Sequence, residues 1–141
     1  LGFKSSNLFK VKNLNFQTEY NWVRPYTYQH RTSSQSYNQY NQALAHPLGA
    51  NFSESVTFVN YRYKNLFAEL KVQIATMGRD TADINLGNDI FKSYETRNSD
   101  YGHYMFDGLK SDLNTVDLRV NYLVNPKYNF ILIQLITIYT L

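Results

Sequence analysis

Apolar and polar residues alternate along several stretches of the chain. Five segments follow this pattern with varying strength, namely 14–23, 53–63, 68–77, 115–124 and 129–139. A period of two places successive side chains on opposite faces of an extended backbone, so each segment is predicted to form a β-strand. No long segment sustains the 3.6-residue period of an amphipathic helix. We therefore expect an all-β protein built from antiparallel strands.

The alternation separates an apolar face from a polar face. Within 68–77 and 115–124, aliphatic side chains occupy one parity and mostly charged or amide side chains the other. Tyr20 and Trp22 stand at one end of the apolar face of 14–23, where an aromatic girdle of a membrane barrel would meet lipid headgroups. The four positions expected to point outward to lipid are Leu70, Val72, Leu118 and Val120.

Two kinds of connection join the expected strands. Long polar connections cover 24–52 and 77–114, whereas the link at 64–67 and the turn at 125–127 are short. Structureless loops beyond about 15 residues are uncommon in compact soluble domains, but outer-membrane barrels combine long extracellular loops with short periplasmic turns. In the short link, Asn65 is expected to take the left-handed conformation that closes a hairpin.

These features together predict an antiparallel transmembrane β-barrel segment in the bacterial outer membrane. Tilted strands of about 9–11 residues span such a membrane, and no stretch has the roughly 18 apolar residues of a membrane helix. A closed barrel needs at least about eight strands, with both chain ends in the periplasm. The single segment 1–141 is therefore expected to be incomplete at both ends. A soluble antiparallel sandwich is the alternative, because its half-exposed strands alternate in the same way.

The amino-acid composition limits the chemistry and the classes of partner that can be expected. The chain has no Cys, which excludes disulfide scaffolds, thiolate catalysis and cysteine-ligated zinc. The formal charge is +3 and the basic residues are spread out instead of forming a stripe, so nucleic acid is not an expected partner. Outer-membrane lipid is the expected partner of the apolar face, and other outer-membrane proteins are further candidates.

The first long connection concentrates aromatic and cationic side chains. It contains no acidic residue between Arg24 and Phe52. Aromatic rings stack on sugar rings, and cationic donors pair with the carboxylates of acidic polysaccharides. The alternative is a solvated loop packed down by its own tyrosines. The candidate ligand-binding residues are Arg24, Tyr26, Tyr28, His30 and His46.

A short turn in the same connection is expected to shape this site. Pro47 restricts one dihedral angle and Gly49 permits a tight bend, so segment 45–49 is predicted to fold back toward the barrel mouth. Arg24, Tyr28, His30 and His46 would then line one concavity. For His46, a buried hydrogen-bonding role is the favoured interpretation.

The second long connection carries many acidic residues, but they lack the spacing of a calcium-binding loop and solvation explains them better. The three His residues are too dispersed for a metal triad, and no Ser stands in a nucleophile elbow. We therefore expect no catalytic residue, metal or cofactor, and a nonenzymatic protein.

Several motifs resemble a known family. Residues 19–30 (EYNWVRPYTYQH), 44–52 (LAHPLGANF) and 86–94 (LGNDIFKSY), with the turns at 63–66 and 125–126, are similar to the C-terminal half of Bacteroidetes outer-membrane proteins related to the Wzi-type capsule-assembly family, including barrels linked to gliding motility. The resemblance covers most of 14–129. It implies an outer-membrane barrel that acts on surface polysaccharide or supports surface adhesion.

The expected function is therefore nonenzymatic surface polysaccharide attachment or assembly, or gliding-related surface organisation. Two alternatives stay open at this point, namely a channel-forming barrel and a soluble carbohydrate-processing β-domain. Ion conductance favours the first alternative and release of sugar by the soluble protein favours the second.

Overall fold

A computed structural model describes residues 1–140, and these form an all-β chain with three short 3₁₀ turns and no α-helix. The strands are β1 (Gly2–Ser6), β2 (Leu14–Val23), β3 (Asn38–Gln39), β4 (Gln42–Ala43), β5 (Phe52–Tyr63), β6 (Leu66–Arg79), β7 (Leu109–Asn125) and β8 (Phe130–Thr140). The 3₁₀ turns are Leu8–Lys10, Ser33–Gln35 and Tyr94–Thr96. The predicted fold class is thereby confirmed at the level of an all-β chain.

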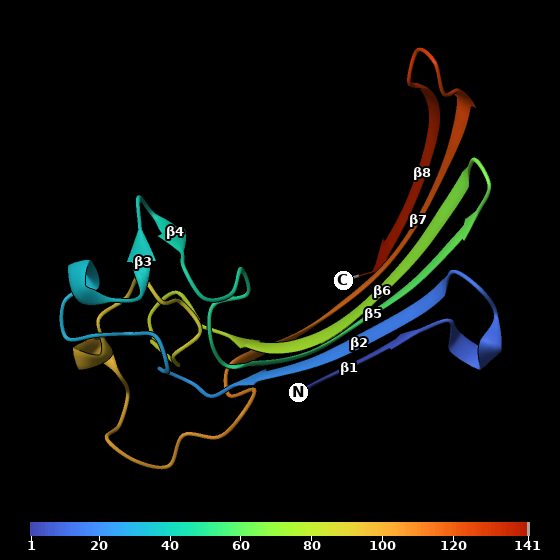
Figure 1. Cartoon of the computed structure of the whole chain (residues 1–141). Coiled ribbons are helices and arrows are strands. Elements are labelled where there is room, and N and C mark those ends of the chain that lie inside the picture. Colours follow the sequence, from blue (N-terminus) through green and yellow to red (C-terminus); the bar gives the residue numbers. More distant parts are fainter. Residues whose placement is uncertain (141) are drawn as a thin grey trace. The chain divides into compact units, whose positions relative to one another are not determined.

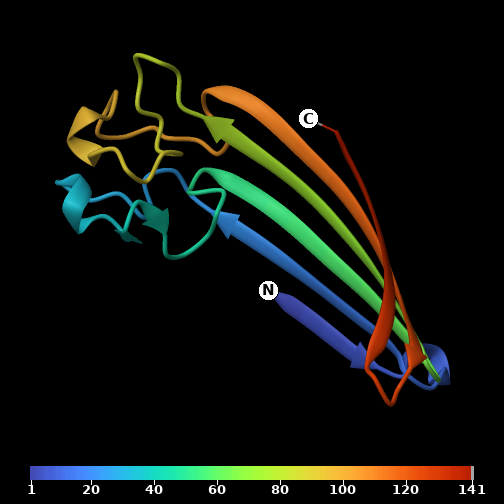
Figure 2. The ribbon, with the colours of Figure 1, turned by 90° about the horizontal axis from the view of Figure 1, so that it is seen from above.

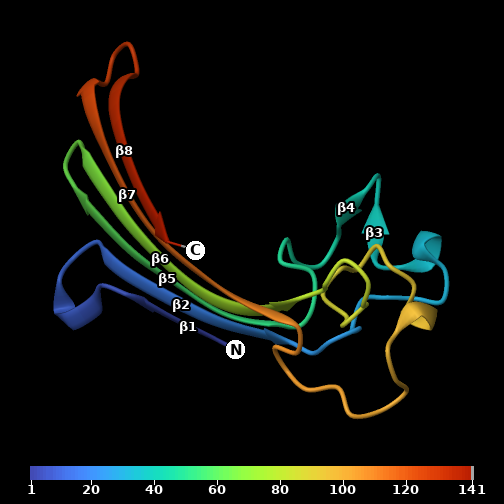
Figure 3. The same ribbon diagram turned by 180° about the vertical axis from the view of Figure 1, so that it is seen from behind.

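Six strands form one sheet in the order β1-β2-β5-β6-β7-β8, and β3 and β4 form a separate hairpin. Views from the front and from behind show the six strands side by side (Figures 1 and 3). β1 pairs antiparallel with β2, and β7 pairs antiparallel with β8. Within residues 1–140 the sheet is open, because β1 and β8 are edge strands that do not pair with each other.

All five predicted strands are present, but the sequence pattern missed or shortened some elements. β1 was not expected, since only its Phe3 contributes a large apolar side chain, which packs near Phe16 with ring centroids 6.2 Å apart. β7 begins at Leu109 instead of at 115, because Lys110 and Asp112 obscure the alternation there. The second long connection is accordingly 80–108, shorter than the predicted 77–114.

The short link between β5 and β6 also differs from the prediction. Lys64 has the left-handed backbone conformation, with φ 49°, and Asn65 does not. Asn65 instead pairs with β7, because its backbone carbonyl accepts from the Leu123 amide at 2.9 Å and its side chain donates to the Leu123 carbonyl at 3.1 Å. This pairing holds Asn65 in the ladder, so the preceding residue makes the reversal.

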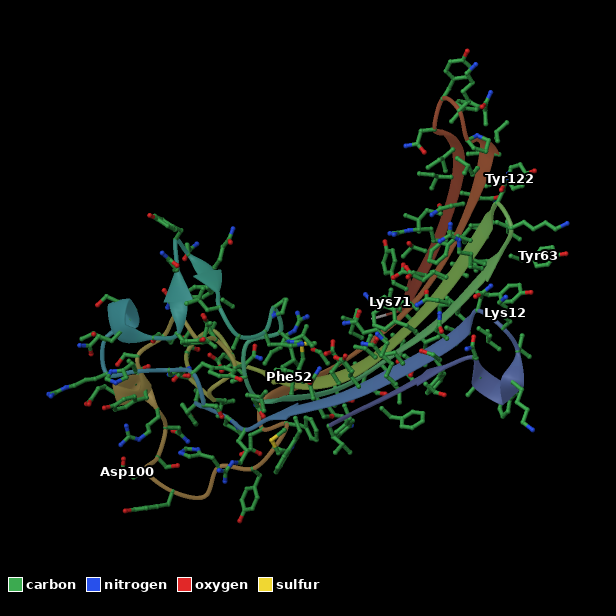
Figure 4. The ribbon with its side chains drawn as sticks, viewed as in Figure 1. Lys12, Phe52, Tyr63, Lys71, Asp100 and Tyr122 are labelled. Carbon is green, nitrogen blue, oxygen red and sulfur yellow. The ribbon has the colours of Figure 1, made fainter. Side chains whose placement is uncertain are left out.

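The chain divides into two compact units. The first consists of Leu1–Tyr20, Ser55–Ile74 and Leu113–Leu141, and the second of Asn21–Glu54 and Ala75–Asp112. In the first unit the strands bend toward the face that carries Lys71, while Tyr63 and Tyr122 extend from the opposite face (Figure 4). On β6 and β7 the apolar and polar parities of the sequence thus occupy different faces, whereas β8 carries exposed apolar side chains on both.

The apolar face of the first unit is left uncovered. Large apolar side chains on one face are exposed, with Leu70 36%, Ile74 55%, Leu118 38% and Tyr122 47% accessible. Val72 and Val120 on the same face are partly exposed. No second layer covers this face within the described part of the unit, so these residues do not form a core under another sheet.

The polar face of the first unit pairs its charges across β6 and β7. Lys71 Nζ lies 3.9 Å from Asp117 Oδ2, and Arg119 Nη1 lies 3.9 Å from Glu69 Oε1. The Thr137 hydroxyl on β8 donates to Asp117 Oδ1 at 2.7 Å. The charged side chains therefore form a ladder of mixed sign in which acids and bases largely compensate each other.

Candidate ligand-binding site

The second unit contains both long connections, and they are held together by hydrogen bonds between residues far apart in sequence. The view from above shows segments 24–51 and 80–108 as irregular loops, without long regular elements (Figure 2). Loops of this kind keep a single conformation only when side chains satisfy the backbone groups that strands would otherwise pair. Buried amide side chains take that role in this unit.

Asn51 is the first of these amides. Its side chain is fully buried, donates to the carbonyls of Gly78 at 2.8 Å and Asp107 at 3.0 Å, and accepts from the Phe106 amide at 2.7 Å. The residue has a left-handed backbone with φ 56°, a conformation that Asn tolerates better than most residues. Asn51 thus joins the start of β5 to both ends of the second long connection.

Asn85 is the second buried amide side chain that organises the loops. Its Nδ2 donates to the Ser93 carbonyl at 2.9 Å and to Thr96 Oγ1 at 3.0 Å, while its Oδ1 accepts from the Gly87 amide at 3.0 Å. The buried Gln29 bonds to the Asn85 side chain and donates to the Asp89 carbonyl at 2.7 Å. This pair of amides connects the first long connection to the second.

Tyr26 packs against the same segment. Its hydroxyl donates to the Asn85 carbonyl at 2.7 Å, and its ring lies 4.5 Å from the His103 ring, centroid to centroid. Burial raises the pKa of the Tyr26 phenol above its usual value; Asp80 and Asp107 act in the same direction and Arg97 opposes them. Tyr26 is therefore a hydrogen-bond donor within the fold over the physiological pH range.

His46 is held by three contacts. Its Nδ1 accepts from the Leu48 amide at 3.2 Å, its Nε2 lies 2.9 Å from Glu54 Oε2, and its ring stacks on Phe52 at 4.4 Å. Because Nδ1 accepts a backbone hydrogen bond, the neutral tautomer with the proton on Nε2 fits this arrangement. This geometry suits a structural role in which both ring nitrogens of His46 make hydrogen bonds within the fold, the interpretation favoured from the sequence.

The other three candidate residues have different neighbours. Tyr28 stacks on Tyr37 with ring centroids 5.9 Å apart, and the exposed His30 ring lies 6.1 Å from Tyr94. The side chain of Arg24 is exposed. Within residues 1–140, no hydrogen bond, ion pair or ring contact joins any two of the five candidates. Tyr28 and His30 thus contact other residues than one another, and the shared concavity stays a prediction.

The second unit does contain a cavity, of about 560 Å³. Pro47, Leu48 and Gly49 form part of its wall, and the remaining wall comes largely from 79–82 and 88–92. Gly49 has the predicted tight bend, with φ 76°, and a Cβ at this position would lie 2.4 Å from the Asn88 carbonyl oxygen. Of the five candidates from the sequence, none lines this cavity.

Asp80 fixes the wall of the cavity. Its Oδ1 accepts from the amides of Leu86 at 2.9 Å and Asn88 at 3.1 Å. Its Oδ2 lies 3.2 Å from Lys92 Nζ, at an angle that does not make a hydrogen bond, so this buried oxygen has a charge partner but no donor in residues 1–140. The sequence predicts a solvated acid at Asp80, because its amide partners are recognisable only in the folded loop.

Comparison of the chain with protein-family models, with curated proteins and with solved structures finds no match. No helix among residues 1–140 is long and apolar enough to cross a membrane. The described residues also contain no cluster of three His, Asp or Glu side chains able to hold a metal ion.

Proposed function

We propose that this chain is a segment of a nonenzymatic outer-membrane β-barrel that holds surface polysaccharide through its long connections. The observation that carries the proposal is the uncovered apolar face of the first unit, where aliphatic and aromatic side chains are exposed while charged side chains pair on the other face. A lipid-facing wall with a polar interior has this arrangement.

The dimensions of the apolar face agree with this proposal. Alternate residues from Leu66 to Ile74 on β6 are apolar, and a rise of about 3.3 Å per residue gives roughly 26 Å along the strand. Tyr63 and Tyr122 are exposed near the short turns, whereas Tyr20 and Trp22 are exposed toward the other end of β2. Aromatic residues at both ends of an apolar band are typical of outer-membrane barrels.

The bend of the first unit toward its polar face supports a curled wall, which further strands would complete. The polysaccharide assignment draws on the resemblance to Wzi-type capsule-assembly proteins and on the second unit. Two long connections that share buried amides and line an open pocket form a shaped surface for a ligand.

The lone Trp of the chain provides a direct test of lipid contact. We expect the whole chain, refolded into vesicles of brominated phosphatidylcholine, to show quenched Trp22 fluorescence, most strongly when bromine is near the headgroups. Vesicles of the unbrominated lipid are the control. A chain that stays in the supernatant after sedimentation of the vesicles, with unquenched Trp22, would contradict the membrane assignment.

The polysaccharide assignment needs a separate measurement. Vesicles that carry the inserted chain are expected to retain purified capsular polysaccharide, whereas empty vesicles do not. Insertion without retention of any polysaccharide would leave the barrel proposal in place and remove the polysaccharide role.

A further inference from the structure

The cavity of the second unit has the size and the mixed chemistry of a small-molecule site. Its volume of about 560 Å³ falls within the range of roughly 300–1,000 Å³ that such sites occupy. Met77 and Ile90 contribute buried apolar surface to the wall, and Phe91 is 37% exposed. An apolar wall with one accessible aromatic ring suits the hydrophobic face of a sugar ring.

The charged residues around the cavity leave hydrogen-bond donors unused. One oxygen of each acid accepts backbone amides, Asp80 Oδ1 from two amides and Asp89 Oδ1 from the Phe91 amide at 3.0 Å. The exposed guanidinium of Arg79 has no acidic partner among the described residues. Lys92 Nζ lies 3.2 Å from Asp80 Oδ2 and keeps the other directions of its ammonium group available.

The wall carries two cations and two acids, so its formal charge is zero. Because Lys92 lies beside Asp80, Arg79 is the cation that is open to the carboxylate of an acidic sugar. Arginine pairs with a carboxylate through two parallel hydrogen bonds, which adds orientation as well as attraction. A hexuronate unit offers a carboxylate and an apolar ring face in one small group. The cavity offers partners for both, because Arg79 and Phe91 are among the residues that line it.

We propose that this cavity, and not the tyrosine-rich part of the first long connection, binds a hexuronate unit of an acidic polysaccharide, with Arg79 pairing its carboxylate and Phe91 stacking on its ring. The proposal rests on the polysaccharide role given above and names the site and the class of sugar. Asp80 is a positioning residue, since it holds Lys92 and two loop amides and its buried carboxylate does not face the ligand directly.

The test is isothermal titration of the whole vesicle-inserted chain with a hexuronate oligosaccharide, oligogalacturonate, and with neutral maltohexaose. We expect binding of oligogalacturonate and weak or no binding of maltohexaose.

Arg79→Gln should weaken oligogalacturonate binding by about tenfold, the loss that follows from removing one charge-assisted pair. Arg79→Lys should recover only part of the affinity, because an ammonium group cannot make the two parallel hydrogen bonds of a planar guanidinium. Phe91→Ala should weaken binding and Phe91→Tyr should preserve it.

Arg31→Gln is the matched control, because Arg31 is exposed in the same unit, lies outside the cavity and pairs with the exposed Glu95 at 3.6 Å. Equal loss in this variant would show general charge attraction and overturn the site. Full affinity in both Arg79→Gln and Phe91→Ala would also overturn it.

If Arg24→Gln or Tyr28→Ala abolishes binding while Arg79→Gln and Phe91→Ala bind normally, polysaccharide binding stands and the cavity assignment fails. Absence of oligogalacturonate binding, with retention of another polysaccharide, overturns the hexuronate class alone.

Discussion

The imidazole Nε2 of His46 lies 2.9 Å from Oε2 of Glu54, and the same carboxylate oxygen accepts a hydrogen bond from Asn21 at 3.1 Å. The Glu54 side chain is only 3% exposed. A buried carboxylate of this kind is stabilised by its donors, and the donors in turn depend on it. The arrangement ties β2, β5 and the 46–49 turn together inside the second unit.

Glu54→Ala should lower the free energy of unfolding by about 2 kcal/mol, because it leaves the His46 and Asn21 donors without this acceptor in a poorly solvated place. Urea titration of the inserted chain measures the change. Glu95→Ala is the control, since the Glu95–Arg31 pair is exposed and such pairs contribute about 0–1 kcal/mol. Equal effects of the two substitutions would contradict the structural role of Glu54.

Asn51→Ala should be at least as damaging, by about 2–3 kcal/mol, because one buried and two partly buried hydrogen bonds are lost together. Asn51→Gly loses the same bonds but accepts the left-handed backbone without strain, so it should be less destabilising than Asn51→Ala. Protease resistance of loops 24–51 and 80–108 reports the effect. The exposed Asn98→Ala should leave resistance unchanged, and an identical response of Asn98 and Asn51 would argue against the amide network.

Leu70→Arg separates a lipid-facing position from a solvent-facing one. Leu70 is 36% exposed, so in a soluble protein this substitution should change stability by no more than about 0.5 kcal/mol. Facing the bilayer, Arg should cost about 2–4 kcal/mol near the midplane. Refolding into vesicles, followed by the heat-dependent shift in gel migration, distinguishes these outcomes. Tyr128→Arg, in the short turn before β8, is expected to be neutral in either case.

The raised pKa of the Tyr26 phenol predicts that the folded chain loses stability at alkaline pH. Its pKa is higher in the folded chain than the ordinary value of 10.0, so the unfolded chain releases this proton first. The stabilisation is fully present below pH 10.0 and decreases as pH rises from there through the folded pKa. Tyr26→Phe should therefore reduce the difference between unfolding midpoints measured at about pH 9 and about pH 11. Tyr40→Phe, at a 91% exposed position, should retain the wild-type difference.

The sequence by itself determined the strands and their faces. Period-two alternation is a local property of an extended backbone, so the pattern placed β2 at Leu14–Val23 and separated the face of Leu70 and Leu118 from that of Lys71 and Asp117. It also located the tight bend at Gly49 and the reversal after Asn125, because both depend on backbone preferences of single residues.

Only the tertiary structure decided which loop residues act together. Tyr26 and His46 were selected for their side-chain chemistry, yet their partners, Asn85 and Glu54, lie 59 and 8 residues away, a spacing that no local pattern encodes. Long connections are organised by whichever distant amides and carboxylates satisfy their backbone groups. Arg79 and Phe91 likewise share a cavity wall because Asp80 accepts the amides of Leu86 and Asn88 and folds the intervening chain back on itself.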